Sequence, residues 1–186
     1  MKIVAVLGSP RPQGNSSTLA RAFLQAAGER GAEITEYLLN QLDFKGCQGC
    51  GGCKNQRDAC ILEDDLAPVL KAVNDADLLV LASPVYFGDL SGQMKCFFDR
   101  TYSYFNPDFS CRMPPGKHVV MVLTQANPEV TEFADIFPRY QRWFTRYGFV
   151  SSHLLRAVGV REPGEVASQT AALDAAAALA RELVKG

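Results

Sequence analysis

Short apolar runs alternate with longer stretches of helical character along this chain, and this alternation constrains the fold more than any other feature. β-branched or leucine-rich runs recur five times, each followed by a segment long enough for a helix. This pattern is typical of a parallel sheet covered by helices on both faces. The expected strands are Lys2 to Leu7, Glu33 to Leu38, Leu78 to Ala82, His118 to Leu123 and Val150 to Val158.

The intervening segments combine apolar residues at helical spacing with capping residues. Asn15-Ser16-Ser17-Thr18 supplies capping side chains at the start of the first helix, and the last helix is rich in alanine. Five βα units predict a flavodoxin-like, doubly wound α/β fold whose five-stranded parallel sheet has the order 2-1-3-4-5. The expected helices are about Ser16 to Glu29, Asp65 to Asn74, Ser91 to Tyr104, Thr131 to Tyr147 and Glu165 to Val184.

Size and charge narrow the classes of function. A chain of 186 residues that is 47% apolar can bury one core, so residues 1–186 are expected to form a single domain. A formal net charge of -1 offers no basic stripe for a nucleic acid. The apolar runs are far shorter than the roughly 20 residues of a membrane helix, and the N-terminus lacks a secretion signal. We therefore expect a cytoplasmic protein.

The segment from Gly8 to Thr18 connects the first strand to the first helix, which is where open α/β sheets bind ligands. Hydroxyl groups, free N–H groups and the helix dipole can converge there on one anion. The segment lacks the motifs of triphosphate and dinucleotide loops, so a monophosphate suits it best; a capped glycine-rich turn is the alternative. The candidate phosphate-binding residues are Ser9, Arg11, Asn15, Ser16, Ser17 and Thr18.

A second candidate loop, Ser83 to Gly88, follows the third expected strand and therefore lies beside the first loop. Pro84 stiffens the backbone, Tyr86 and Phe87 offer stacking planes, and Gly88 permits close approach, as a flat isoalloxazine ring requires. Core aromatics at a strand end are the alternative. The candidate ring contacts are Pro84, Val85, Tyr86, Phe87 and Gly88.

A third loop, Thr124 to Pro128, follows the fourth expected strand. By the same rule it lies at the same edge of the sheet. Thr124, with Gln125 and Asn127, could donate or accept hydrogen bonds at the edge of a flavin.

Three motifs together resemble the NADPH-dependent FMN reductase family over about the first hundred residues. They are Gly8-Ser9-Pro10-Arg11 with Gly14-Asn15-Ser16, Ser83-Pro84-Val85-Tyr86-Phe87-Gly88, and Lys95 with Phe98-Asp99-Arg100. The resemblance implies bound FMN, its phosphate on the first loop and its ring at Pro84 to Gly88. It also implies NAD(P)H as co-substrate and a homodimer or homotetramer. The third loop departs from the family's glycine-rich version, so contacts from Gln125 and Asn127 stay open.

Four of the six cysteines lie in a cysteine-rich loop at about residues 45–62, with the spacing C-x2-C-x2-C-x6-C. The first part has the spacing with which ferredoxins hold a [4Fe-4S] cluster, and it is too compressed for the usual structural zinc site. The loop resembles the cysteine motif of iron–sulfur flavoproteins, a branch of the same family. Relatives without a cluster carry similar cysteines, so a redox-active thiol set or a buried loop staple stays open. The candidate cluster ligands are Cys47, Cys50, Cys53 and Cys60.

The remaining polar and aromatic residues receive structural interpretations. His118 and His153 are expected to be surface or packed histidines, and Cys96 and Cys111 are expected to be structural. Asp64 and Asp65 are expected to cap the second helix. Three aromatic residues are expected in the core or at a subunit contact: Trp143, Phe144 and Tyr147. Three others are expected to cover the flavin site or to dock a second subunit: Tyr102, Tyr104 and Phe105.

The leading hypothesis is an FMN-dependent oxidoreductase that takes electrons from NAD(P)H and passes them to a small acceptor such as a flavin or a quinone. If the cysteines hold a cluster, it supplies one-electron steps. The alternatives are a non-enzymatic carrier that accepts electrons from a ferredoxin, and a binding module without flavin. Oxidation of NADPH or NADH by the holoprotein would distinguish the leading hypothesis from the non-enzymatic carrier.

Overall fold

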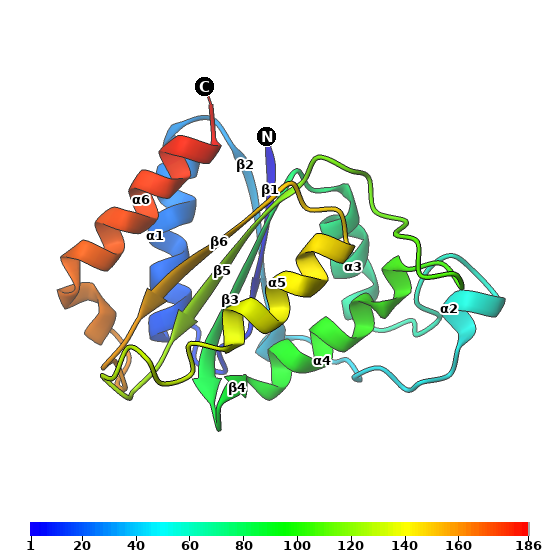
Figure 1. Ribbon diagram of the computed structural model, residues 1–186, viewed down its shortest axis with the longest axis horizontal. Coiled ribbons are helices and arrows are strands. Elements are labelled where there is room, and N and C mark those ends of the chain that lie inside the picture. The colour runs from blue at the N-terminus through cyan, green and yellow to red at the C-terminus, as the bar shows by residue number, and fades with distance from the viewer. Residues whose placement is uncertain (186) are drawn as a thin grey trace.

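A computed structural model describes residues 1–185 as a twisted sheet between two layers of helices (Figure 1). The five long strands are parallel and have the order β2-β1-β3-β5-β6. This is the predicted flavodoxin-like order, with the short strand β4 added antiparallel to β3. The strands are β1 (Lys2–Leu7), β2 (Glu33–Leu38), β3 (Leu78–Tyr86), β4 (Asp89–Leu90), β5 (His118–Thr124) and β6 (Ser151–Ala157).

Helices cover both faces of the sheet. Helices α1 and α6 lie on one face, and α3, α4 and α5 lie on the other (Figure 1). The helices are α1 (Asn15–Glu29), α2 (Gly52–Asn55), α3 (Leu66–Asp75), α4 (Gly92–Arg100), α5 (Ile136–Arg146) and α6 (Thr170–Leu183). Short 3-10 turns are η1 (Leu39–Gln41), η2 (Thr101–Tyr104) and η3 (Glu165–Ser168).

Alternation along the central strands builds two cores. In β1, Ile3 and Ala5 pack under α1 and α6, whereas Val4 and Val6 face α3, α4 and α5. Because successive side chains of a strand point to opposite faces, a nearly continuous apolar run serves both cores at once. This burial on two faces explains why the apolar runs were sufficient to predict the sheet.

The third strand is longer than predicted. The sequence interpretation ended it at Ala82 and made Ser83 to Gly88 a loop, but β3 continues to Tyr86 and pairs with β5 up to Pro84. Its pairing with β1 ends at Ala82, and a proline without an N–H is tolerated where one strand edge is free. Phe87 and Gly88, with φ of 47° and 80°, form the two-residue turn to β4. Positive φ at both central residues matches the twist of a tight hairpin.

Other boundaries differ by shorter segments. Helix α5 begins at Ile136 rather than near Thr131, after a turn in which Phe133 has a φ of 60°. The predicted C-terminal helix is divided into η3 and α6, and the predicted third helix ends as the 3-10 turn η2. Within residues 1–185, no helix is long and apolar enough to cross a membrane.

The two histidines share a hydrogen-bond partner at one end of the sheet. His118 Nδ1 and His153 Nε2 lie 2.7 and 2.8 Å from the hydroxyl of Ser151, at the amino ends of β5 and β6. They are therefore at the opposite end of the sheet from the loops considered below.

Candidate functional site

The loop between β1 and α1 is a tight turn that only glycine can complete at two points. The N–H of Arg11 donates to Ser9 Oγ at 3.1 Å, and the N–H of Gly14 donates to the carbonyl of Arg11 at 2.9 Å. A Cβ at Gly14 would lie 2.4 Å from Ser9 Oγ, and a Cβ at Gly8 would lie 2.6 Å from Met94 Cβ. The backbone therefore passes close to its neighbours and leads directly into the start of α1.

Ser16, in the first turn of α1, carries a polar atom without a protein partner. Its Oγ is buried and makes no hydrogen bond, and no other buried side-chain oxygen or nitrogen among residues 1–185 is left in this way. Leaving such a group unpaired costs about 1–3 kcal/mol. The first N–H groups of a helix also lack intrahelical partners and carry the positive end of the helix dipole. The start of α1 is therefore suited to an anion.

The other predicted phosphate residues differ in their positions. Arg11 lines the cavity at the start of α1, and its Nη1 donates to the carbonyl of Arg161 at 3.2 Å. Asn15 also lines it, but its side chain binds Glu162 and Val166. Ser17 is buried and Thr18 half-buried, and neither lines the cavity.

One cavity of about 260 Å³ joins the three predicted loops. Ser9 and Ser16 lie at one side, and Pro84, Val85 and Tyr86 from the end of β3 lie at another. Parallel strands bring their carboxyl ends to a common edge, which explains the convergence. The full lining is Ser9, Arg11, Gly14, Asn15, Ser16, Pro84, Val85, Tyr86, Thr124, Gln125, Ala126, Val160, Arg161 and Pro163.

Two predicted ring contacts lie outside this cavity. Phe87 and Gly88 form the tip of the β3–β4 hairpin, and the Phe87 side chain is fully exposed. Neither residue lines the cavity wall, whereas Tyr86 does. Gly88 lies instead beside Phe133, since a Cβ built on it would be 3.6 Å from that ring.

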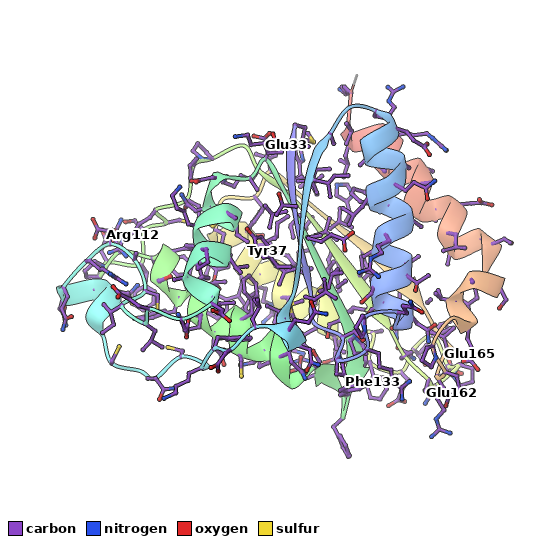
Figure 2. All side chains as sticks on the ribbon, turned by 180° about the vertical axis from the view of Figure 1, so that it is seen from behind. Glu33, Tyr37, Arg112, Phe133, Glu162 and Glu165 are labelled. Atoms are coloured by element: carbon purple, nitrogen blue, oxygen red, sulfur yellow. The ribbon has the colours of Figure 1, made fainter. Side chains whose placement is uncertain are left out.

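Sequence reasoning missed the segment after β6. Val160, Arg161 and Pro163 form part of the cavity wall, and the N–H of Val160 donates to the carbonyl of Gln125 at 3.0 Å. Figure 2 shows Glu162 and Glu165 at the same end of the molecule as Phe133, near the first turn of α1. The rule for carboxyl ends of strands, applied to the fifth strand as well, would have found this segment.

A second cavity, of about 150 Å³, brings together the four clustered cysteines. Cys47 and Cys50 are exposed, Cys53 is buried and Cys60 is partly buried. Gly49 and Gly51 have φ of 61° and 69°, which lets the chain turn tightly between the first three thiols. No three ligating side chains of the described residues are close enough to hold a single metal ion. The four cysteines line one cavity, but their thiols do not converge on the position of a single ion.

Arg100, at the end of α4, holds both ends of the cysteine loop. Its guanidinium is fully buried and forms an ion pair with Asp64, with a shortest distance of 2.7 Å. It also donates to the carbonyl oxygens of Lys45 and Leu62. Burial disfavours the charge of Asp64, but hydrogen bonds, led by that of Arg100, outweigh it and lower the pKa of this carboxyl. Asp64 thus does more than cap a helix, although its Oδ1 also accepts the N–H of Leu66.

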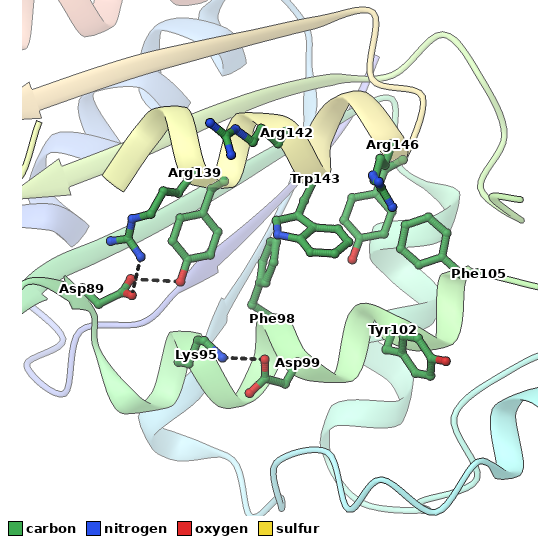
Figure 3. Close-up of a pocket in the computed structure, with 12 residues that line it drawn as sticks. Asp89, Lys95, Phe98, Asp99, Tyr102, Phe105, Arg139, Arg142, Trp143 and Arg146 are labelled. Atoms are coloured by element: carbon green, nitrogen blue, oxygen red, sulfur yellow. Dashed lines mark hydrogen bonds and ion pairs between the residues drawn. The ribbon is translucent and has the colours of Figure 1, made fainter. Parts of the chain in front are cut away.

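A third cavity, of about 630 Å³, is a groove between α4 and α5 (Figure 3). Its floor is aromatic and its rim is charged, with one ion pair between Lys95 and Asp99 and another between Arg139 and Asp89. Trp143 is 42% exposed on it, and the guanidinium of Arg146 lies 5.5 Å from the centre of the Trp143 ring system. Tyr102 is exposed at the end of the groove, whereas Tyr104, Phe105, Phe144 and Tyr147 belong to the core.

The fold and the cavity define a class: flavodoxin-like proteins with a cavity where the strand order reverses. A family model described as NADPH-dependent FMN reductase matches residues 1–129. The chain belongs to this family.

Individual proteins agree with this assignment. An iron–sulfur flavoprotein of Methanocaldococcus jannaschii is 41% identical over 101 residues, which cover 54% of this chain and 52% of the relative. A Bacillus subtilis protein named as an NAD(P)H-dependent FMN-containing oxidoreductase is 24% identical over 96% of both chains. The chain spans about half the length of the iron–sulfur flavoproteins that it matches.

Solved structures share the whole fold. The NAD(P)H:quinone oxidoreductase of Methanothermobacter marburgensis superimposes with a TM-score of 0.78 at 19% identity, covering 100% of this chain and 98% of that one. An FMN-dependent NADH-azoreductase from Bacillus anthracis in complex with FMN has a TM-score of 0.76 at 14% identity, and both chains are covered completely. At these identities the likeness establishes the fold.

Proposed function

We propose that this protein is an FMN-dependent oxidoreductase that takes electrons from NAD(P)H and passes them to a small acceptor such as a flavin or a quinone. One observation carries the proposal: the unpartnered hydroxyl of Ser16 and the β3 residues Pro84 to Tyr86 line the same cavity. A phosphate and a flat ring on one ligand require such a pair of subsites. Family membership supports FMN as that ligand.

The residues present fit FMN. Its phosphate would lie at the start of α1, where Ser9, Ser16 and Arg11 line the cavity. Its ring would lie along Pro84, Val85 and Tyr86, with Thr124 at the same cavity. Ser17 and Thr18 would act through the helix start, and Phe87 and Gly88 through the hairpin that borders the site.

Bound FMN supplies the redox chemistry, since it accepts a hydride from NAD(P)H and returns two electrons to an acceptor. The protein supplies binding and orientation. The end of β3 gives the ring a rigid wall, and Gln125 and the segment after β6 close the opposite wall. No side chain needs to act as a general acid or base in this scheme, so none is assigned.

The four cysteines are proposed to hold a [4Fe-4S] cluster. The donor set is suitable, because Cys47, Cys50, Cys53 and Cys60 line one cavity and the loop is anchored by a buried arginine. The names of the archaeal relatives add support. A cluster would supply one-electron steps beside the two-electron chemistry of the flavin.

The α4–α5 groove is proposed to be the contact between two copies of the chain. It exposes Trp143 and Tyr102 over an apolar floor, and its rim carries both signs of charge, as a self-complementary interface requires. A homodimer or homotetramer would bury these aromatic rings.

The test of function is anaerobic purification followed by reconstitution with FMN and rapid mixing with NADPH or NADH. We expect bleaching of the flavin by a nicotinamide nucleotide and multiple turnovers with a quinone or free flavin. If reduced ferredoxin bleaches the bound flavin but neither NADPH nor NADH does so, the result would contradict the proposal and favour the carrier alternative. A protein that takes up no FMN would contradict both.

A further inference from the structure

Cys60 differs from the other three clustered cysteines in the environment of its sulfur. The Nε–H of Arg100 donates to Cys60 Sγ at 3.0 Å. Among the described residues, no N–H donor is placed on the sulfur of Cys47, Cys50 or Cys53. One thiol of the four is therefore held by a cationic donor.

The guanidinium that makes this contact cannot turn away from it. Nη1 donates to the carbonyl of Lys45 and to Asp64, each at 2.7 Å, and Nη2 donates to Asp64 at 3.0 Å. The side chain is fully buried, so water does not compete for these donors. All three nitrogens are committed, and their planar geometry aims Nε at the sulfur.

Holding the cysteine loop in place does not require the contact between Arg100 and the Cys60 sulfur. The ion pair with Asp64 and the two carbonyl contacts already fix the loop to the end of α4. A hydrogen bond to a cluster thiolate withdraws negative charge from the sulfur, and such bonds are one of the factors that set the potential of an iron–sulfur cluster.

We propose that Arg100 is a positioning residue for the cluster: through Nε–H it orients the Cys60 thiolate as a ligand and raises the reduction potential of the cluster. The inference rests on the proposed cluster. It assigns the two ends of the ligand set different surroundings, with Cys47 and Cys50 toward solvent and Cys60 against the guanidinium.

The experiment compares the reconstituted parent with Arg100→Lys and Asp64→Asn in an anaerobic redox titration followed by EPR. Lysine keeps the positive charge but lacks the three-nitrogen fork, so it cannot hold Asp64, the carbonyls and the sulfur together. We expect R100K to lower the reduced-to-oxidised ratio of the cluster about tenfold at a fixed potential, the equivalent of about 59 mV for one electron. D64N keeps the Nε–H donor and removes a negative charge, so it should shift the ratio the other way.

The outcomes separate the two proposals. Iron and sulfide in the parent together with an unchanged potential in R100K would overturn the role of Arg100 alone. A parent that binds FMN but never holds iron would overturn the cluster and this inference together. If R100K does not fold, pulsed EPR on the parent with ¹⁵N-labelled arginine replaces it.

In that measurement we expect a ¹⁵N coupling to the reduced cluster, and its absence would overturn the inference. Arg57 also binds at Cys60, through the backbone carbonyl, so the coupling must persist in Arg57→Lys. Loss of the coupling in that variant would assign it to Arg57 and would equally overturn the inference.

Discussion

The Asn15 side chain donates from Nδ2 to the carbonyl oxygen of Glu162 at 2.9 Å, and so joins the start of α1 to the segment after β6. The same amide accepts the N–H of Val166 through Oδ1 at 3.1 Å. Two walls of the cavity, far apart in sequence, are thereby held at a fixed separation. Asn15, which lines the cavity, is therefore also a brace between two parts of the site.

Replacing Asn15 with alanine should destabilise the protein and loosen the cavity. Asn15 is buried, and the variant leaves the N–H of Val166 without a partner and the carbonyl of Glu162 with only the N–H of Glu165, at a cost of about 1–3 kcal/mol in the free energy of unfolding. Asn15→Asp, which can still accept from Val166 but cannot donate to Glu162, should lose part of that amount. Urea unfolding of the apoproteins measures the difference. Equal stability of all three proteins would contradict the brace.

Gly14→Ala should damage the site, because the new methyl group would lie 2.4 Å from Ser9 Oγ. The backbone at residue 14 or the Ser9 side chain must therefore move, and both residues line the cavity. We expect the affinity for FMN to fall at least about tenfold, or about 1.4 kcal/mol. Gly92→Ala is the control, since a Cβ there meets nothing within 4 Å and the residue is helical. It should keep the affinity and gain up to about 1 kcal/mol in stability. An FMN titration of G14A that matches the parent would be inconsistent with this packing.

Stability at acidic pH should depend on Asp89, which joins β4 to α5. Burial disfavours its charge, but hydrogen bonds from the Leu90 N–H, Arg139 and Tyr140 outweigh that effect and lower its pKa. A carboxyl with a lowered pKa stabilises the fold above its ordinary pKa, and that contribution disappears as the pH falls through the lowered value. Asp89→Asn should be less stable than the parent at neutral pH, and the difference should shrink on acidification. A stability difference between the two proteins that stays constant down to the acid transition would contradict this role of Asp89.

Trp143→Glu should separate the subunits if the α4–α5 groove is the contact. A buried charge in place of a large aromatic anchor should raise the dissociation constant by about thirtyfold or more, the equivalent of about 2 kcal/mol. Val130→Glu, at an exposed apolar residue outside the groove, is the control and should leave assembly unchanged. Sedimentation velocity over a concentration series measures both. Identical assembly of W143E and the parent would show that the groove is not the contact between subunits.

Local patterns predicted the fold because its determinants are local. Apolar runs such as Ile3 to Leu7 feed two cores, and this burial on both faces is visible in the sequence. The extension of β3 past Ala82 was missed, since Pro84 normally ends a strand and the pairing with Thr124 depends on a distant segment. Which edge of a strand is free is a tertiary property.

The site was predictable where it follows strand ends and unpredictable where it depends on long-range contacts. Ser9, Ser16 and Tyr86 were found because they follow β1 or end β3. The bonds of Asn15 to residues 162 and 166, and the burial of Arg100 against Asp64 and Cys60, join segments that no local pattern connects. Arg161 follows the end of β6, so the strand-end rule would have found it had the rule been applied to the last strand.

The most direct measurement of the central claim is a titration of the apoprotein and of Ser16→Ala with FMN, beside their unfolding curves. Ser16 Oγ has no protein partner to lose, so alanine should leave the apoprotein as stable as the parent or up to about 1 kcal/mol more stable. The account predicts one FMN per chain in the parent and an affinity about tenfold lower in S16A. Equal FMN affinity in the two proteins, or no FMN uptake by the parent, would contradict it.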